Sequence, residues 1–455
     1  MKLNRSLAIS TKIQECIKGN IIGVLGNEFP ELNIDKADGD KSRDRVFTPQ
    51  NTLLTMVLSA VQQDKSLQNA VDLYYFIHQQ NKFDTKKELE SIMALQSLSD
   101  QQSVKKSAGR PKNYIARLPK SLDKNISHNT AAYSKARSRL PISLTEELFD
   151  KSRLNNVNNK YSHFHGYRVL IADGTYLQLQ DTESIKAEFE VKEKAKGSGE
   201  YPQALLEVIT ERGTGQLYSF ILKNRHSSEL ALFHDMIDEL PVKSLVLADD
   251  LYNCFEVIAK CKRKGVELLM PAKRKRNYEV IKVLGKGDEI IRVKTPKKRS
   301  NWVDKNEEAQ ELVIRRLECK SPEGKDYVLN TTILDENIEK EELQLLYLTR
   351  WDIEISIREI KTIMDINILR SKTPEMSLKE LTVSLATYNL IRKVIHASTE
   401  SLPFSPSEDF IQKFYSLNKD ILIDKKGRVY NKWSTGRRRA GGNPQKSKTA
   451  KAQAQ

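Results

Sequence analysis

Three acidic residues stand where carboxylates could take part in one reaction. Asp173 follows the apolar run RVLIA, and Asp249 follows SLVLA, two runs that predict buried strands. In sheets, functional groups gather where strands end. Glu354 lies in the charged segment YLTRWDIEISIREIK at 347–361. Taken singly, each acid reads more readily as an exposed strand end or a cap, so the three matter mainly as a set.

The chemistry that needs such a set is phosphodiester cleavage and transfer by two Mg²⁺ ions about 4 Å apart. These ions require hard oxygen ligands, one of which bridges the metals. One ion would activate water or a DNA 3′-hydroxyl, and the other would stabilise the leaving oxygen. We therefore expect Asp173, Asp249 and Glu354 to be catalytic residues and ligands of two Mg²⁺ ions, for which Mn²⁺ can substitute.

The charged segment 347–361 predicts a helix with an unusual stripe. At 100° per residue, a stripe about 80° wide collects one acid, three cations and an aromatic: Tyr347, Arg350, Glu354, Arg358 and Lys361. A neighbouring apolar stripe predicts a buried face and contains Leu346, Ile353, Ile357, Ile360 and Met364. The charged stripe suits phosphate groups. A solvated helix with i,i+4 pairs explains this segment equally well.

The elements around Asp173 and Asp249 predict a mixed α/β sheet. Period-two runs in RVLIAD, TYLQLQ, QALLEVITER and QLYSFILKN predict strands, and Gly213-Thr214-Gly215 predicts a hairpin between the last two. A helix in SSELALFHDMIDEL, the strand SLVLAD, a helix in YNCFEVIAKCKRKG and the strand ELLMPA follow. Three antiparallel strands followed by alternating helices and strands match the order of the ribonuclease-H-like fold.

The remaining segments suggest five regions. We expect a helical N-terminal DNA-binding region, a first part of the catalytic core, a β-rich insertion, a second part of the core with the charged helix, and a C-terminal region with a basic tail. Their boundaries are 1–158, 159–273, 274–335, 336–400 and 401–455. From Lys425 onward the tail carries ten Lys and Arg and no acid.

Composition narrows the class of partner. The 455 residues are 39% hydrophobic, enough for real cores, and carry a net charge of +15 with a pI near 9.3. Such a balance favours a polyanion, first of all nucleic acid. Four cysteines without CxxC spacing give no zinc signature or disulfide framework. No signal peptide or membrane span is evident, so we expect a cytoplasmic protein associated with the nucleoid and not with a membrane.

The stripe residues also match a known signature. The chain resembles insertion-sequence transposases of the DDE class that carry Y-x2-R-x3-E-x6-K, which include the bacterial cut-and-paste group. Tyr347, Arg350, Glu354 and Lys361 match every spacing. Further matching segments are DGT at 173–175, Trp351 after the signature arginine, YSKARSRLP at 133–141 and LATYNLIR at 385–392. The resemblance covers roughly residues 130–440 and implies the same ribonuclease-H-like core interrupted by a β-rich insertion.

The resemblance implies residue roles. The three acids would be the metal ligands, and Tyr347, Arg350 and Lys361 would contact phosphates near the scissile bond. We expect Trp351 and Arg358 to contact DNA as well. The family uses an aromatic residue of the insertion to hold a flipped base; that role would fall to Trp302, although a hydrophobic anchor explains it equally well.

One position departs from the family pattern. The family commonly has a basic residue after the second Asp, whereas this chain reads Ala-Asp-Asp-Leu-Tyr at 248–252. Either Asp249 or Asp250 could therefore be the ligand. Asp249 is preferred because it shares a strand face with Leu245 and Leu247. The nearby acids Asp352 and Glu359 fall at about 140° and 120° on the helix and should point away from the stripe.

The expected function is DNA transposition. The chain would bind the inverted-repeat ends of its insertion sequence as double-stranded DNA, cleave them with Mg²⁺ and transfer the strands into target DNA, with a homodimer holding the two ends. Two alternatives stay open. One is a catalytically silent DNA-binding relative such as a transposition inhibitor, and the other is a structure-specific nuclease on the same fold.

Overall fold

The structure of the chain is a computed structural model. The structure describes residues 46–62, 64–75, 129–154, 161–189, 201–274, 276–297, 311–321, 324–362, 364–400, 421–423 and 429–431. The chain forms two compact units, residues 1–394 and 395–455. All of the predicted site residues that the structure describes belong to the first unit.

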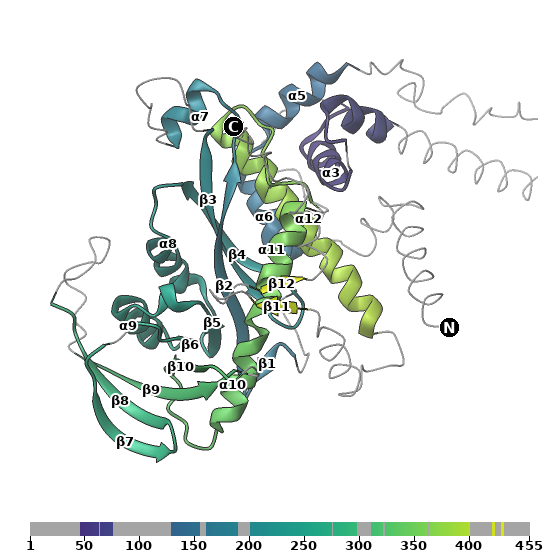
Figure 1. The fold of residues 1–455 in the computed structure, drawn as a ribbon. Coiled ribbons are helices and arrows are strands. Elements are labelled where there is room, and N and C mark those ends of the chain that lie inside the picture. The colour runs from purple at the N-terminus through teal and green to yellow at the C-terminus, as the bar shows by residue number, and fades with distance from the viewer. Residues whose placement is uncertain are drawn as a thin grey trace, which may run out of the picture. The chain divides into compact units, whose positions relative to one another are not determined.

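A mixed ten-stranded sheet runs through the first unit (Figure 1), and it confirms the predicted α/β class. Its central strands follow the order β4-β3-β2-β5-β6. They are β2 (Tyr167–Gln178), β3 (Gln203–Glu211), β4 (Leu217–Asn224), β5 (Ser244–Leu247) and β6 (Glu267–Pro271). The strands β2, β3 and β4 pair antiparallel, whereas β5 pairs parallel with both β2 and β6. The short β1 (His163–Phe164) pairs with β2.

Both faces of this sheet are buried, which explains the nearly continuous apolar runs of β2 and β5. Alternate residues of each strand enter different cores. Val169 and Ile171 of β2 belong to one core cluster, and Leu170 and Ala172 belong to the other. The position of a residue along β2 therefore determines which side of the sheet it faces.

Helices cover the two faces (Figure 1). One core contains residues of α8 (Glu229–Met236) and α9 (Phe255–Lys264). The other contains residues of α10 (Lys340–Leu348), α11 (Asp352–Thr362) and α12 (Pro374–Glu400). The LATYNLIR segment docks α12 onto β4, because the Asn389 side chain accepts a hydrogen bond from Leu217 N at 2.8 Å and donates one to Leu217 O at 3.0 Å. The short elements between these are α7 (Glu183–Glu188), η4 (Ile237–Glu239), η5 (Asp250–Tyr252) and η6 (Thr349–Trp351).

Strands from the expected insertion extend the same sheet. They are β7 (Glu279–Gly285), β8 (Asp288–Lys294), β9 (Glu311–Lys320) and β10 (Asp326–Thr331). The strand β10 pairs antiparallel with β6, and β9, β8 and β7 follow in that order. The insertion is thus joined to the core by backbone hydrogen bonds. Trp302 lies outside the described residues.

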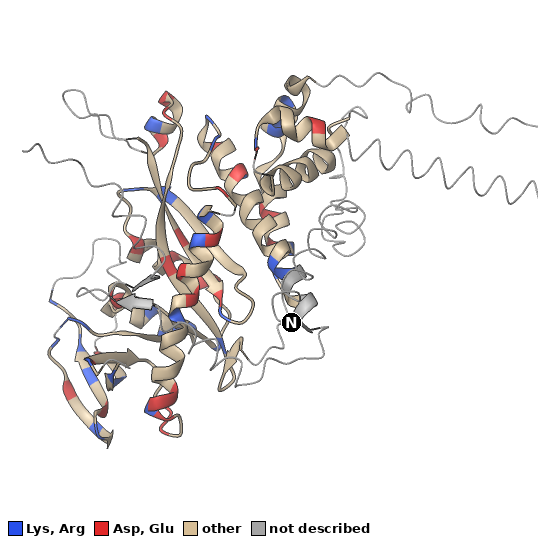
Figure 2. Ribbon diagram, turned by 45° about the vertical axis from the view of Figure 1, so that its right-hand side comes forward, with Lys and Arg blue, Asp and Glu red and all other residues tan. Residues whose placement is uncertain are grey.

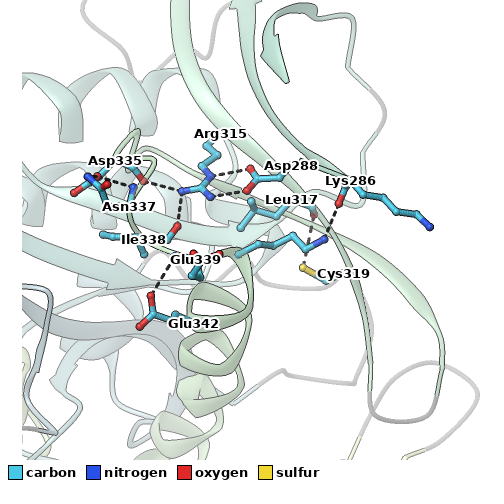
Figure 3. A network of polar contacts seen from close by, with 11 residues as sticks. Lys286, Asp288, Arg315, Leu317, Cys319, Asp335, Asn337, Ile338, Glu339 and Glu342 are labelled. Carbon is cyan, nitrogen blue, oxygen red and sulfur yellow. Dashed lines mark hydrogen bonds and ion pairs between the residues drawn. The ribbon is translucent and has the colours of Figure 1, made fainter. Parts of the chain in front are cut away.

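A buried ion pair fixes this extension to the start of α10 (Figure 3). Arg315 of β9 is 2% exposed and binds Asp288 of β8 through Nε at 2.8 Å and Nη2 at 2.5 Å. Its Nη1 donates to the carbonyls of Asp335 and Ile338, at 2.8 and 2.9 Å. Glu339 then begins α10 with a reciprocal capping box. The pair therefore positions the helix that leads to Arg350.

We expect Arg315→Met to destabilise the protein by about 3–5 kcal/mol, because it leaves the carboxylate of Asp288 buried without a partner. The matched control is Arg316→Met. Arg316 binds the exposed Glu318 at 2.9 Å and should contribute at most about 1 kcal/mol. Denaturant unfolding measures both changes. Equal stabilities for the two variants would contradict this role, whereas adding Asp288→Leu to Arg315→Met should recover much of the loss.

The described N-terminal region is helical, as expected. It contains α3 (Pro49–Ala60), a helical segment at 67–75, α5 (Thr130–Arg139) and α6 (Ile142–Ser152). Phe47 packs its ring against Tyr74 and Tyr133, with centroids 5.2 Å apart in both cases. The second unit contains the two-stranded pair β11 (Ile421–Ile423) and β12 (Val429–Asn431). The proposed domain boundaries remain predictions.

Acidic and basic residues are interspersed along the described ribbon (Figure 2). None of the helices in the described ranges is long and apolar enough to cross a membrane. Because the two signs of charge are mixed along the described ribbon, the charged groups that matter for function are small local ones. The main one surrounds the three predicted acids.

Candidate active site

The register of β2 and β5 brings Asp173 and Asp249 together. Ile171 of β2 lies opposite Leu247 of β5 in a parallel pair, and both are fully buried in the same core. Each acid is two residues further along, so both emerge on that face. The prediction that Asp173 follows a strand was wrong, because β2 continues to Gln178. β5 ends at Leu247 instead, which leaves β2 without a β5 partner at Asp173.

Asp249 and Asp250 point to different places. Asp249 caps η5, where its Oδ1 accepts a hydrogen bond from Leu251 N at 2.6 Å, and its charge acts on Asp173. The Oδ1 of Asp250 accepts from Lys273 N at 2.7 Å. The geometry therefore favours Asp249 as the partner of Asp173, in agreement with the strand-face argument.

The charged segment is not one continuous helix, contrary to expectation. It is divided into α10, the 3₁₀ turn η6 and α11. The Thr349 hydroxyl donates to Leu346 O at 2.7 Å, a local bond of the kind that competes with regular helix geometry. The turn still keeps Tyr347 beside Arg350, and the Tyr347 hydroxyl contacts Ala248 O at 3.3 Å, next to Asp249.

Glu354 and Arg350 form an ion pair at this site. Arg350 Nη2 lies 3.3 Å from Glu354 Oε1, and the guanidinium lies 5.3 Å from the Trp351 ring centroid. The Arg350 side chain is only 13% exposed, whereas that of Glu354 is 43% exposed. Arg350 is therefore not a solvated surface residue. This argues against the alternative that the charged stripe is the solvated face of a helix.

Lys361 connects α11 to the DGT segment. Its Nζ donates to Thr175 Oγ1 at 2.8 Å. Asp173, Thr175, Glu354 and Lys361 all line one cleft of about 740 Å³, and the exposed Arg358 lies on the same lining. Two of the signature residues, Glu354 and Lys361, thus border a common space with the first acid.

The acids expected to point away from the stripe do so. Glu359 accepts a hydrogen bond from the Tyr388 hydroxyl at 3.2 Å and lies 3.8 Å from Arg392, both on α12. Burial raises the pKa of Asp352, and the charges of Arg212 and Arg392 oppose that shift. Glu359 therefore faces α12, and the charges that act on Asp352 are those of Arg212 and Arg392 and not those of the stripe.

Burial and charge act together on the site. Burial raises the pKa of Asp173; Arg350 and the Gly174 N–H lower it, and Asp249 raises it. Burial likewise raises the pKa of Glu354, Arg350 lowers it, and Asp173 raises it. For Arg350, burial lowers the pKa, but Tyr347 and the three acids outweigh this effect. Holding these carboxylates ionised is therefore costly without more positive charge.

The donor set fits divalent ions in its chemistry. All three candidate ligands are carboxylates, which Mg²⁺ and Mn²⁺ prefer. Added positive charge would also offset the cost that raises the pKa values of Asp173 and Glu354. Within the described residues, however, no three His, Cys, Asp or Glu side chains stand together in a metal-binding geometry. The Glu354 carboxylate, one of the three candidate ligands, is instead paired with the Arg350 guanidinium.

Asp173→Asn should stabilise the protein when divalent ions are absent. The folded state holds the Asp173 proton more tightly than the unfolded state, so stability falls as pH rises from the usual aspartate pKa through the raised one. The Asn variant escapes this loss and should melt higher at neutral pH. Thermal unfolding in EDTA at acidic and neutral pH measures the difference. An Asn variant that melts lower at neutral pH would contradict the cost assigned to this carboxylate.

The sequence is similar to known transposases. Residues 164–390 match the family described as Transposase DDE domain. The transposase InsG for insertion sequence element IS4 of Escherichia coli (strain K12) is 30% identical over 269 residues. The match covers 58% of this chain and 60% of that relative, less than two thirds of its length.

Two solved structures show weak likeness. The piggyBac transposase synaptic complex with hairpin DNA has a TM-score of 0.41 and 11% identity, over 92% of this chain and 78% of that chain. A pre-cleavage Mos1 transpososome has a TM-score of 0.16 and 10% identity, over 36% of this chain and 61% of that chain. These scores are too low to support an argument about the fold, so the assignment rests on the sequence matches. Residues 164–390, just under half of the chain, are thus similar to the transposase DDE domain of a family of metal-dependent enzymes that cleave and transfer DNA.

Proposed function

We propose that the chain is a DNA transposase of the Y-x2-R-x3-E-x6-K type, which cleaves the inverted-repeat ends of its own insertion sequence and joins them to target DNA. The observation that carries this proposal is the β2–β5 register, which sets Asp173 beside Asp249 on the face covered by α11. The strand order β4-β3-β2-β5-β6, three antiparallel and then parallel, supports a ribonuclease-H-like core. A bacterial, nucleoid-associated protein that pairs two ends as a homodimer fits this function.

Asp173, Asp249 and Glu354 would hold two divalent ions, Mg²⁺ or Mn²⁺. When bound, such ions activate an attacking oxygen and stabilise the leaving one. Glu354 must first exchange its bond to Arg350 for that role. An incoming DNA phosphate offers Arg350 two non-bridging oxygens that share one negative charge, and the planar guanidinium fork can bind both of them.

The cationic residues would grip and align the strand. Arg350 and Lys361 border the acids from α11 and its preceding turn, and Arg358 extends the positive lining of the same cleft. Trp351 supports the guanidinium of Arg350 from one side. With the phosphate held by these side chains, the scissile bond would lie in line with the three carboxylates. Tyr347 would contact a neighbouring phosphate.

The test uses DNA that carries the short inverted repeats expected to flank the gene. The full chain should cut at the repeat ends in Mg²⁺ and not in EDTA, and it should join the released 3′-ends to a second DNA. Cutting at branched DNA irrespective of the repeats would indicate a structure-specific nuclease instead. Specific binding without cutting in Mg²⁺ or Mn²⁺ would indicate a silent relative.

A further inference from the structure

A second pair of carboxylates lies behind Asp173, on the opposite face of the sheet. Glu207 of β3 stands directly across from Gly174 of β2 and shares the face of Ile209, toward α8 and α9. It is fully buried. Glu229 is the first residue of α8 and is half-buried. Neither acid belongs to the expected site, since nothing in the local sequence pattern distinguishes them.

Tyr252 joins these two acids. Its hydroxyl lies 2.7 Å from Glu207 Oε1 and 2.8 Å from Glu229 Oε1. The side chain is fully buried and packs edge-on against Phe233, with centroids 5.0 Å apart. A phenol carries one proton and can donate to one carboxylate only. The other of the two acids must therefore be protonated and donate its own proton to the Tyr252 oxygen. The contact with Tyr252 holds the Glu229 side chain in one position.

Gly174 lets the two faces approach each other. A Cβ at this position would lie 2.7 Å from Glu229 Cδ and 2.9 Å from Glu207 Oε2, closer than real side chains allow. On the other side, Asp173 Oδ1 accepts a hydrogen bond from Gly174 N at 3.0 Å. The carboxylates of Asp173 and Glu229 thus border the same residue, where β2 has no β5 partner.

One atom of the cluster lacks a partner. Glu207 Oε2 is buried and receives no hydrogen bond from the described part of the chain. A buried carboxylate oxygen in this state is costly unless positive charge or a donor reaches it. Burial raises the pKa of Glu207 and of Glu229, Tyr252 lowers both, and Asp173 and Asp249 raise both. The charges of Asp173 and Asp249 therefore act on both Glu207 and Glu229.

We propose that Glu229 is a fourth carboxylate of the divalent-ion site, presented past Gly174 by the Tyr252 hydroxyl. Glu207 is the buried partner that fixes Tyr252 from the other side. Tyr252 and Glu207 are positioning residues, since they act on the ion through Glu229. This inference rests on the proposed function, because it extends the site of Asp173 and Asp249.

The test measures Mn²⁺ binding by the full chain without DNA, by electron paramagnetic resonance of the free ion. Glu229→Gln keeps the size of the side chain and should raise the Mn²⁺ concentration for half-saturation at least ~10-fold. Tyr252→Phe keeps the packing on Phe233 and should raise it by a smaller factor. Glu239→Gln, which alters an acid bonded to Ser219, should leave it unchanged. Melting in EDTA checks folding, and Glu229→Ala provides a second variant with the same expected loss.

The outcomes separate the two proposals. Wild-type Mn²⁺ affinity in folded Glu229→Gln or Glu229→Ala would overturn the role of Glu229. If Asp173→Asn loses affinity in the same assay, the proposed site itself stands. Wild-type affinity in Asp173→Asn, or no Mn²⁺ binding by the unaltered chain, would overturn both.

Discussion

Asp173→Asn, Asp249→Asn and Glu354→Gln should each reduce Mg²⁺-dependent cleavage of element ends below detection. Changes in the outer shell of a metal site typically cost about 10–100-fold in affinity or activity, and loss of a direct ligand should cost more than that. Binding of the DNA should persist, because Arg350 and Lys361 remain. A cleavage assay beside a gel-shift assay measures both properties.

The neighbouring acids provide matched controls. Asp250→Asn alters the residue next to Asp249, whose Oδ1 binds Lys273 N instead. Glu359→Gln alters an acid of α11 that faces α12. Both variants should cleave normally. Full activity in Asp249→Asn together with loss in Asp250→Asn would show that the second ligand is assigned incorrectly.

Arg350→Ala and Lys361→Ala should each slow cleavage about 100-fold, since misplacing the scissile phosphate by about 1 Å has an effect of that size. Arg350→Lys should not restore the rate, because an ammonium group cannot reproduce the planar fork on a phosphate. Melting temperatures should show that the variants are folded. The measurement is the single-turnover rate of end cleavage at saturating protein.

An exposed helical ion pair provides the comparison. Lys151 binds Glu147 at i,i+4 on α6, and both side chains are more than 40% exposed. Lys151→Ala should cost at most a few tenths of a kcal/mol, about what such pairs contribute, and leave cleavage alone. If Arg350→Ala and Lys361→Ala behave like Lys151→Ala, the charged stripe is a solvated helix face and the phosphate-binding role is wrong.

The sheet could be predicted from the sequence because strands and turns leave patterns within short segments of the chain. Apolar runs such as RVLIA and SLVLA require burial on both faces, and the Gly213-Thr214-Gly215 turn joins β3 to β4 as expected. The sequence could not show where pairing stops. Gly174 reads as a break between two strands, yet β2 runs through it, and the open edge at Asp173 comes from the end of β5.

Other parts of the site depend on contacts between distant segments. The helical wheel treated 347–361 as one helix, but a single hydroxyl bond at Thr349 accompanies a 3₁₀ turn that the wheel cannot anticipate. Glu207, Glu229 and Tyr252 are far apart in sequence and meet only through β3, α8 and η5. The bond between Lys361 and Thr175 spans 186 residues, although both positions were already visible in the signature and the DGT segment.

The most direct measurement of the central claim replaces Mg²⁺ with Fe²⁺ in the full chain and generates hydroxyl radicals with ascorbate, so that the backbone is cut beside the bound ion. A site formed by Asp173, Asp249 and Glu354 predicts cuts near all three residues, which excess Mg²⁺ suppresses and Asp173→Asn abolishes. Cuts at other positions, or cuts near these residues that survive in Asp173→Asn, would contradict the site.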